Sequence, residues 1–182
     1  MTTRPTWLLP PIDQLTEFPV GKIADQLSRL ERYAGSCPQF YSVARHSLLV
    51  MDLLPDDPEL RLLGLIHDAH ECWIGDVLLP VKKRIGFAID ELGCEYDHIL
   101  WGLLGLSPCP ATLQMVEQAD RTACQLEMQL LGLPDAEVLA AMPGMRNRGL
   151  HLVPIHTNHD DAEEWEIAFD SLRDACAKQG ET

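Results

Sequence analysis

Long apolar runs are missing from this chain of 182 residues. No run approaches the roughly 18 apolar residues that a membrane-spanning helix needs, which excludes such a span. The first residues, MTTRPTW, also lack the basic region and the apolar stretch of a secretory signal. We therefore expect a cytoplasmic protein with no membrane partner.

Basic residues are also scarce, with 14 Lys and Arg against 28 Asp and Glu and a net charge of −14. Such a surface repels nucleic acid polymers and anionic lipid, so we expect neither as a partner. A small anionic substrate is still compatible, because a bound metal and a few local cations can reverse the sign of charge inside one pocket.

The six cysteines include no Cys-x-x-Cys pair. This argues against a zinc ribbon and against a thioredoxin-type redox site. We expect free thiols that pack as small apolar groups.

Apolar residues recur at helical spacing through most of the chain, without a repeat or an alternating strand series. We expect an all-α fold and a single domain over residues 1–182, with its motif region at 29–131. The leucine-rich segments should form its centre, and Asp57 before Pro58 should cap the second of them. The predicted helices are 42–54, 59–72, 88–105, 110–131 and 162–177, with a helical turn at 135–142 and an extended stretch at 150–155.

Polar residues interrupt the second leucine-rich segment, where His67, Asp68 and Glu71 follow a run of apolar residues. Buried imidazoles and carboxylates cost several kcal/mol unless they are partnered, and the sequence offers no adjacent cation. Spacings of three and four residues let all three side chains face one cavity. The pattern favours a divalent metal as partner, although His67 and Asp68 alone could be a satisfied core pair.

Two further residues are polar where the helical pattern predicts an apolar one, His46 and Asp120. Helix packing could bring them to His67 and Asp68 as two imidazoles and two carboxylates. Such a set suits one divalent ion of Mn, Co, Fe, Ni or Zn, and Mg is also compatible.

The order His46, His67-Asp68, Asp120 resembles the H…HD…D pattern of the HD-domain metal-dependent phosphohydrolases. The segments SVARHS at 42–47 and HDxxExxxGD at 67–76, followed by PVK at 80–82, are similar to two groups in that family. These groups are the bacterial HD-domain 5′-deoxynucleotidases and the phage HD-domain dATP triphosphohydrolases. The resemblance covers roughly residues 29–125, and the rest fits only in helical character.

The resemblance implies an HD-domain fold and a role for each matching residue. Glu71 matches the acidic residue that handles the water nucleophile or protonates the leaving group, and Asp76 matches a residue near the sugar. Asp76 could also merely cap a turn after Gly75. The residues that match the family's metal ligands are His46, His67, Asp68 and Asp120.

Two cations match residues that contact phosphate in the family, Arg32 and Lys82. Arg32 could equally be a solvated surface residue. Lys82 begins the densest basic cluster of an acidic chain, residues 82–84, which favours a phosphate role over an ordinary surface role.

The expected function is metal-assisted hydrolysis of a phosphate ester in a (deoxy)nucleotide, with release of phosphate from nucleoside 5′-monophosphates. One alternative is a nucleoside triphosphate triphosphohydrolase. Another is a non-catalytic domain that uses the site for ligand sensing or for a structural metal. The resemblance also implies a homo-oligomer.

Overall fold

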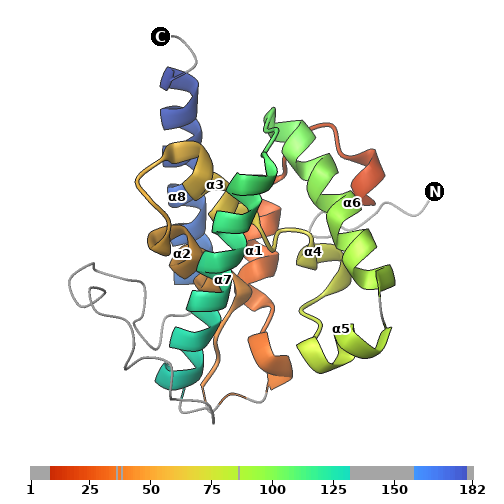
Figure 1. Ribbon diagram of the computed structural model, residues 1–182. Coiled ribbons are helices and arrows are strands. Elements are labelled where there is room, and N and C mark those ends of the chain that lie inside the picture. Colours follow the sequence, from red (N-terminus) through yellow and green to blue (C-terminus); the bar gives the residue numbers. More distant parts are fainter. Residues whose placement is uncertain (1–8, 36, 38, 86, 132–157, 180–182) are drawn as a thin grey trace.

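Helices form the framework of the protein, and the computed structural model describes residues 9–35, 37, 39–85, 87–131 and 158–179 (Figure 1). Over these residues no β-strand occurs, which confirms the all-α prediction. The elements are η1 (Ile12–Gln14), α1 (Val20–Arg29), η2 (Arg32–Gly35), α2 (Val43–Leu53), α3 (Pro58–Ile66), α4 (Glu71–Ile74), α5 (Leu79–Ile85), α6 (Phe87–Leu104), α7 (Pro110–Leu130) and α8 (Asn158–Gln179). The described helices include none that is both long and apolar enough to cross a membrane.

Four predicted helices, at 42–54, 88–105, 110–131 and 162–177, correspond to α2, α6, α7 and α8. The helices α1 and α5 were not predicted. The predicted turn at 135–142 and extended stretch at 150–155 lie outside the described residues.

Side-chain caps define where α2 and α3 begin. The Ser42 hydroxyl accepts a hydrogen bond from the Arg45 backbone N–H at 3.0 Å, and the Asp57 carboxylate accepts one from Leu60 N–H at 2.8 Å. Each cap satisfies a backbone donor that the first helical turn leaves free. The predicted cap at Asp57 is therefore confirmed.

The helices α2 and α3 lie at the centre, because they pack on each other and both contact α7 and α8. Gly64 permits their close approach, since a Cβ there would lie 2.4 Å from Leu54 Cδ1. Most of α2 is buried, from Val43 through Met51. Polar residues on α2 therefore face the protein interior.

The prediction of one helix over 59–72 is wrong, because α3 ends at Ile66 and α4 begins at Glu71. The His67 ring bonds to the Gly64 carbonyl at 2.8 Å, and the following amides bond three residues back, as Ala69 N–H does to the Ile66 carbonyl. The chain is thereby tightened into a 3₁₀-like turn at this point. This turn carries His67 and Asp68, and His67 lies 4.0 Å from Asp120 in the middle of α7.

Candidate metal centre

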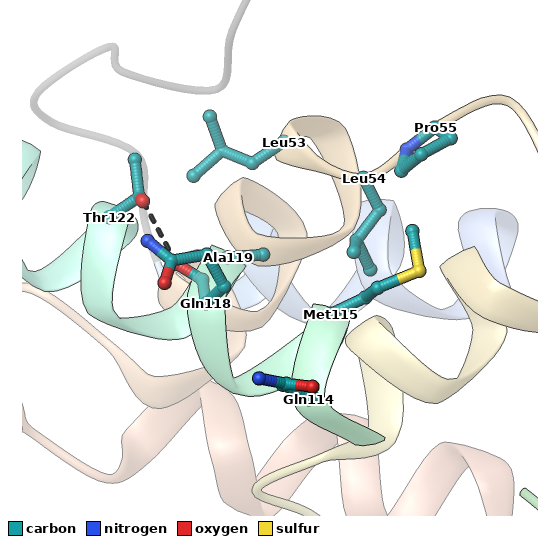
Figure 2. Close-up of a pocket in the computed structure, with 8 residues that line it drawn as sticks. All are labelled: Leu53, Leu54, Pro55, Gln114, Met115, Gln118, Ala119 and Thr122. Atoms are coloured by element: carbon teal, nitrogen blue, oxygen red, sulfur yellow. Dashed lines mark hydrogen bonds between the residues drawn. The ribbon is translucent and has the colours of Figure 1, made fainter. Parts of the chain in front are cut away.

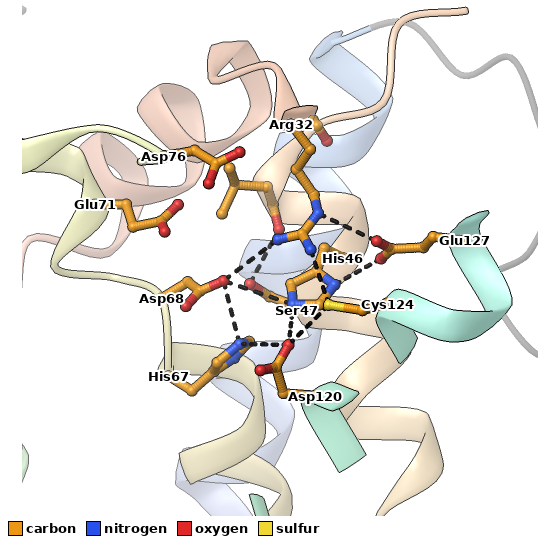
Figure 3. Close-up of polar contacts among 12 residues, drawn as sticks. Arg32, His46, Ser47, His67, Asp68, Glu71, Asp76, Asp120, Cys124 and Glu127 are labelled. Carbon is orange, nitrogen blue, oxygen red and sulfur yellow. Dashed lines mark hydrogen bonds and ion pairs between the residues drawn. The ribbon is translucent and has the colours of Figure 1, made fainter. Parts of the chain in front are cut away.

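Four side chains from three parts of the chain converge beside α7 (Figure 3). The His46 Nε2 atom lies 3.0 Å from Asp120 Oδ1 and 3.6 Å from Asp68 Oδ2. The His67 Nε2 atom lies 3.1 Å from Asp68 Oδ2 and 4.0 Å from Asp120 Oδ1. The structure therefore brings together the four residues that the sequence pattern nominated as ligands.

The two imidazole rings present the same atom to this cluster. Their Nε2 atoms are buried and have no hydrogen-bond partner, because the nearby carboxylates lie within ion-pair distance without hydrogen-bond geometry. Their Nδ1 atoms are held, in His46 by Glu127 Oε1 at 2.6 Å and in His67 by the Gly64 carbonyl at 2.8 Å. A ring that donates from Nδ1 offers its lone pair at Nε2. The donor set therefore fits one divalent cation.

The cluster strongly shifts the pKa of its members. Burial alone would lower the pKa of His67, but Asp68 and Asp120 outweigh it and raise the pKa to about 9. Burial and the charge of Arg32 would lower the pKa of His46. Glu127 and Asp120 outweigh them, so the pKa of His46 is also raised. Each imidazolium is thus stabilised by carboxylates while no cation is bound.

The charge balance of the cluster also favours protonated imidazoles or a bound cation. The cluster holds three carboxylates, of Asp68, Asp120 and Glu127, and one guanidinium, of Arg32, which pairs with Asp68 and Glu127. Two negative charges remain when both imidazoles are neutral. Either two imidazole protons or one divalent cation would balance them.

Arg32 is 8% exposed, so the alternative of a solvated surface residue is wrong. Its Nε donates to Glu127 Oε2 at 3.1 Å, its Nη2 contacts Cys124 Sγ at 3.2 Å, and its Nη1 lies 3.7 Å from Asp68 Oδ2. The sequence offers no cation adjacent to Asp68, but Arg32 reaches it from a distant part of the chain. Of its three nitrogens, Nη1 is the one directed toward the carboxylate of Asp68.

Glu71 forms the wall next to Asp68 and is 3% exposed. Its Oε1 atom lies 3.9 Å from Lys82 Nζ, and its Oε2 atom is buried without a hydrogen-bond partner. Burial raises the pKa of Glu71 to about 9, helped by the charges of Asp68 and Asp76 and opposed by those of Arg32 and Lys82. The carboxyl group therefore holds a proton at neutral pH in the metal-free chain.

Gly75 ends α4 with a φ of 79° and turns the chain toward Asp76. The Asp76 carboxylate accepts a hydrogen bond from the Tyr33 backbone N–H at 3.2 Å. This bond joins the segment after α4 to η2, so Asp76 holds two walls of the site together. Lys82 follows on α5, at the edge of the same group.

Sequence reasoning missed three residues of the cluster, Glu127, Tyr33 and Cys124. Glu127 is fully buried, and the Tyr33 hydroxyl donates to its Oε2 atom at 2.8 Å. One signal was available, because Asp120, Cys124 and Glu127 follow one another at helical spacing on one face of α7. An acidic residue on the same helix face as a proposed ligand indicates a second buried carboxylate.

A cavity of about 390 Å³ lies apart from this cluster, between the end of α2 and α7 (Figure 2). It is lined by Leu53, Leu54, Pro55, Gln114, Met115, Gln118, Ala119 and Thr122. None of these eight side chains is ionisable. The cavity thus lacks the acid, base and cation that the polar cluster provides.

Comparison with known proteins finds no matching family model. The chain is similar to the uncharacterized protein YfdR of Escherichia coli, with 29% identity over 141 residues that cover 77% of this chain and 76% of YfdR. It is 34% identical over 132 residues to the uncharacterized protein RCAP_rcc00048 of Rhodobacter capsulatus, covering 66% of this chain and 67% of that protein. These names assign no activity. At this identity and coverage, the chain belongs to the family of RCAP_rcc00048.

Proposed function

We propose that this protein is a divalent-metal-dependent phosphohydrolase that acts on (deoxy)nucleotides and releases phosphate from nucleoside 5′-monophosphates. One observation carries the proposal: two buried imidazole Nε2 atoms lack hydrogen-bond partners and lie within 4.0 Å of the carboxylates of Asp68 and Asp120. Buried ring nitrogens without a hydrogen-bond partner are costly, and a divalent cation would satisfy both of them together. The resemblance to HD-domain phosphohydrolases in the order of these residues also supports it.

His46, His67, Asp68 and Asp120 would hold the metal. When bound, it would polarise a phosphoryl oxygen and lower the pKa of a water molecule. Two carboxylates and two neutral imidazoles offset its charge, so the phosphate dianion meets no net repulsion from the ligands. The carboxylate of Glu127 is in turn balanced by the guanidinium of Arg32.

Glu71 is the acid–base residue of the proposed reaction. It stands beside the ligands, with one oxygen unpartnered and with a pKa raised to about 9 by burial and by Asp68 and Asp76. A carboxyl group that keeps its proton at neutral pH can give it to the leaving oxygen. Proton transfer of this kind contributes about two to four powers of ten in rate.

Two cations bind the phosphoryl group in this proposal. Arg32 offers its Nη1 atom near Asp68, and Lys82 offers Nζ 3.9 Å from Glu71. The remaining basic residues of α5, Lys83 and Arg84, are exposed. One reachable cation on α5 favours a single phosphoryl group over a triphosphate chain, which would need more positive charge along its length.

Phosphate release from a panel of nucleotides tests the proposal. The panel holds ribo- and deoxyribonucleoside 5′-monophosphates and 5′-triphosphates, each assayed with Mg²⁺, Mn²⁺, Co²⁺ and Zn²⁺. We expect inorganic phosphate from monophosphates. Tripolyphosphate from triphosphates would favour the triphosphohydrolase instead. A chain that binds metal and hydrolyses no member of the panel would refute the enzyme and leave the sensing or structural role.

A further inference from the structure

Glu127 is fully buried on α7 and accepts hydrogen bonds from three side chains that come from two distant parts of the sequence. Its Oε1 atom lies 2.6 Å from His46 Nδ1. Its Oε2 atom accepts from Arg32 Nε at 3.1 Å and from the Tyr33 hydroxyl at 2.8 Å. Both oxygens are therefore committed to contacts within the cluster.

The contact with His46 decides which ring nitrogen is available. A carboxylate has no proton to give, so the short contact requires the N–H of the ring at Nδ1. The lone pair is then at Nε2, which faces Asp120 and Asp68 at 3.0 and 3.6 Å. A carboxylate behind a metal-binding imidazole also raises the basicity of the ligand.

The contact with Arg32 decides where its guanidinium points. Glu127 takes the Nε edge, and Cys124 Sγ lies 3.2 Å from Nη2. The Nη1 atom is left on the side of Asp68, at 3.7 Å. Without Glu127 this side chain would lose the buried carboxylate that binds its Nε edge.

We propose that Glu127 is a positioning residue that prepares both halves of the site at once, His46 for the metal and Arg32 for the phosphate. The inference rests on the proposed function and adds a residue outside the ligand set. In this proposal Glu127 is not one of the ligands, and it acts through the two side chains that it orients.

The variant Glu127→Gln separates this role from simple packing, because an amide of the same shape has one acceptor and one donor end. We expect the amide oxygen to face Arg32 and Tyr33, where it keeps two hydrogen bonds, one of them with a charged donor. The amide N–H then faces His46 Nδ1, so the ring must accept there and carry its proton on Nε2. That tautomer cannot bind a metal through Nε2.

The experiment measures Co²⁺ affinity by the visible absorption of the bound ion, and KM and kcat for one nucleoside monophosphate at saturating Co²⁺. For Glu127→Gln we expect Co²⁺ binding weakened about 10- to 100-fold, the usual effect of removing such a partner. We also expect a higher KM, because Arg32 is held less firmly. The matched control is Glu117→Gln, the same change at an exposed residue of the same helix, which should leave both quantities unchanged.

Circular dichroism and thermal melting confirm that each variant is folded before its affinity is read. If Glu127→Gln does not fold, Glu127→Asp replaces it, since it keeps the charge but is too short to reach His46 and Arg32 together. A folded variant with wild-type Co²⁺ affinity and wild-type KM overturns the positioning role while leaving the proposed function intact. A wild-type protein that takes up no Co²⁺ overturns the proposed function, and the positioning role with it.

Discussion

Glu71 gives the folded protein a pH-dependent stability that a single substitution should remove. Its pKa is about 9 in the folded chain, because burial and the neighbouring Asp68 and Asp76 disfavour its charge, against an ordinary value of 4.5. Between these values the folded chain keeps a proton that the unfolded chain releases. The free energy of unfolding therefore falls as the pH rises through this window, by about 1.4 kcal/mol per pH unit from this group.

The variant Glu71→Gln has no proton to release at this position, so its stability should lack that slope. Relative to the wild type, we expect Glu71→Gln to gain about 3 kcal/mol between about pH 6 and about pH 8. Contributions from other titrating groups are shared by both proteins and cancel in the difference. Below the ordinary carboxyl pKa the two proteins should differ little, since Glu71 is then neutral in both states.

Urea unfolding of the metal-free proteins, prepared with a chelator, measures this difference at each pH. The exposed Glu117→Gln variant is the control and should follow the wild type. A constant difference between Glu71→Gln and wild type across the range would mean that Glu71 is ionised in the folded chain, and its assignment as a proton donor would be wrong. In the metal-loaded enzyme the same variant should keep its metal and lose about two to four powers of ten in turnover.

Asp120→Ala should lose bound divalent metal and nearly all activity, because it removes a charged ligand. If metal analysis of the purified variant found a full equivalent of metal, Asp120 would be excluded from the site. Lys82→Ala should lower kcat/KM by an amount equivalent to about 1.5–3 kcal/mol and leave the metal content unchanged. The control Lys83→Ala, at an exposed residue, should match the wild type in the same kinetic comparison. Equal small effects in both variants would mean that the basic cluster is a solvated patch. Arg45→Ala should cost about 3–5 kcal/mol in urea unfolding, because it removes the cationic partner of the buried Asp161 carboxylate on α8. Arg29→Ala, which breaks an exposed pair, should cost under about 1 kcal/mol, and similar losses in the two variants would refute the importance of the buried pair.

Much of the fold could be predicted because its signals are local. The caps at Ser42 and Asp57, the helical spacing of apolar residues and the proline at the start of α7 all lie within a few residues of what they determine. The break between α3 and α4 could not be predicted, because the polar residues that interrupt the apolar pattern at 67–71 are also compatible with a continuous helix. At the break the Ala69 and Glu71 amides bond three residues back, and the His67 ring bonds to the Gly64 carbonyl.

Some contacts of the candidate site could be predicted from local sequence signals, and others depend on how distant helices pack. The grouping of His67 and Asp68 with His46 could be predicted from polar residues inside apolar helices. The environment of Arg32 could not, because its partner Glu127 is 95 positions away and is reached only when α7 packs beside η2. Sequence spacing indicates which residues share one helix face, but it does not indicate which faces meet.

The energetic cost of the site favours catalysis over a purely structural metal. Tyr33 and Ala34 adopt left-handed backbone conformations, with φ of 58° and 51°, and each costs roughly 1–3 kcal/mol. Glu71 adds a buried oxygen without a partner, at about 1–3 kcal/mol. A structural ion needs its ligands alone and gains nothing from these features, whereas an active site needs a protonated acid beside its metal. The wild type should therefore be the less stable and the more active protein when it is compared with Glu71→Gln, and a variant that gained stability without losing turnover would exclude Glu71 as the proton donor.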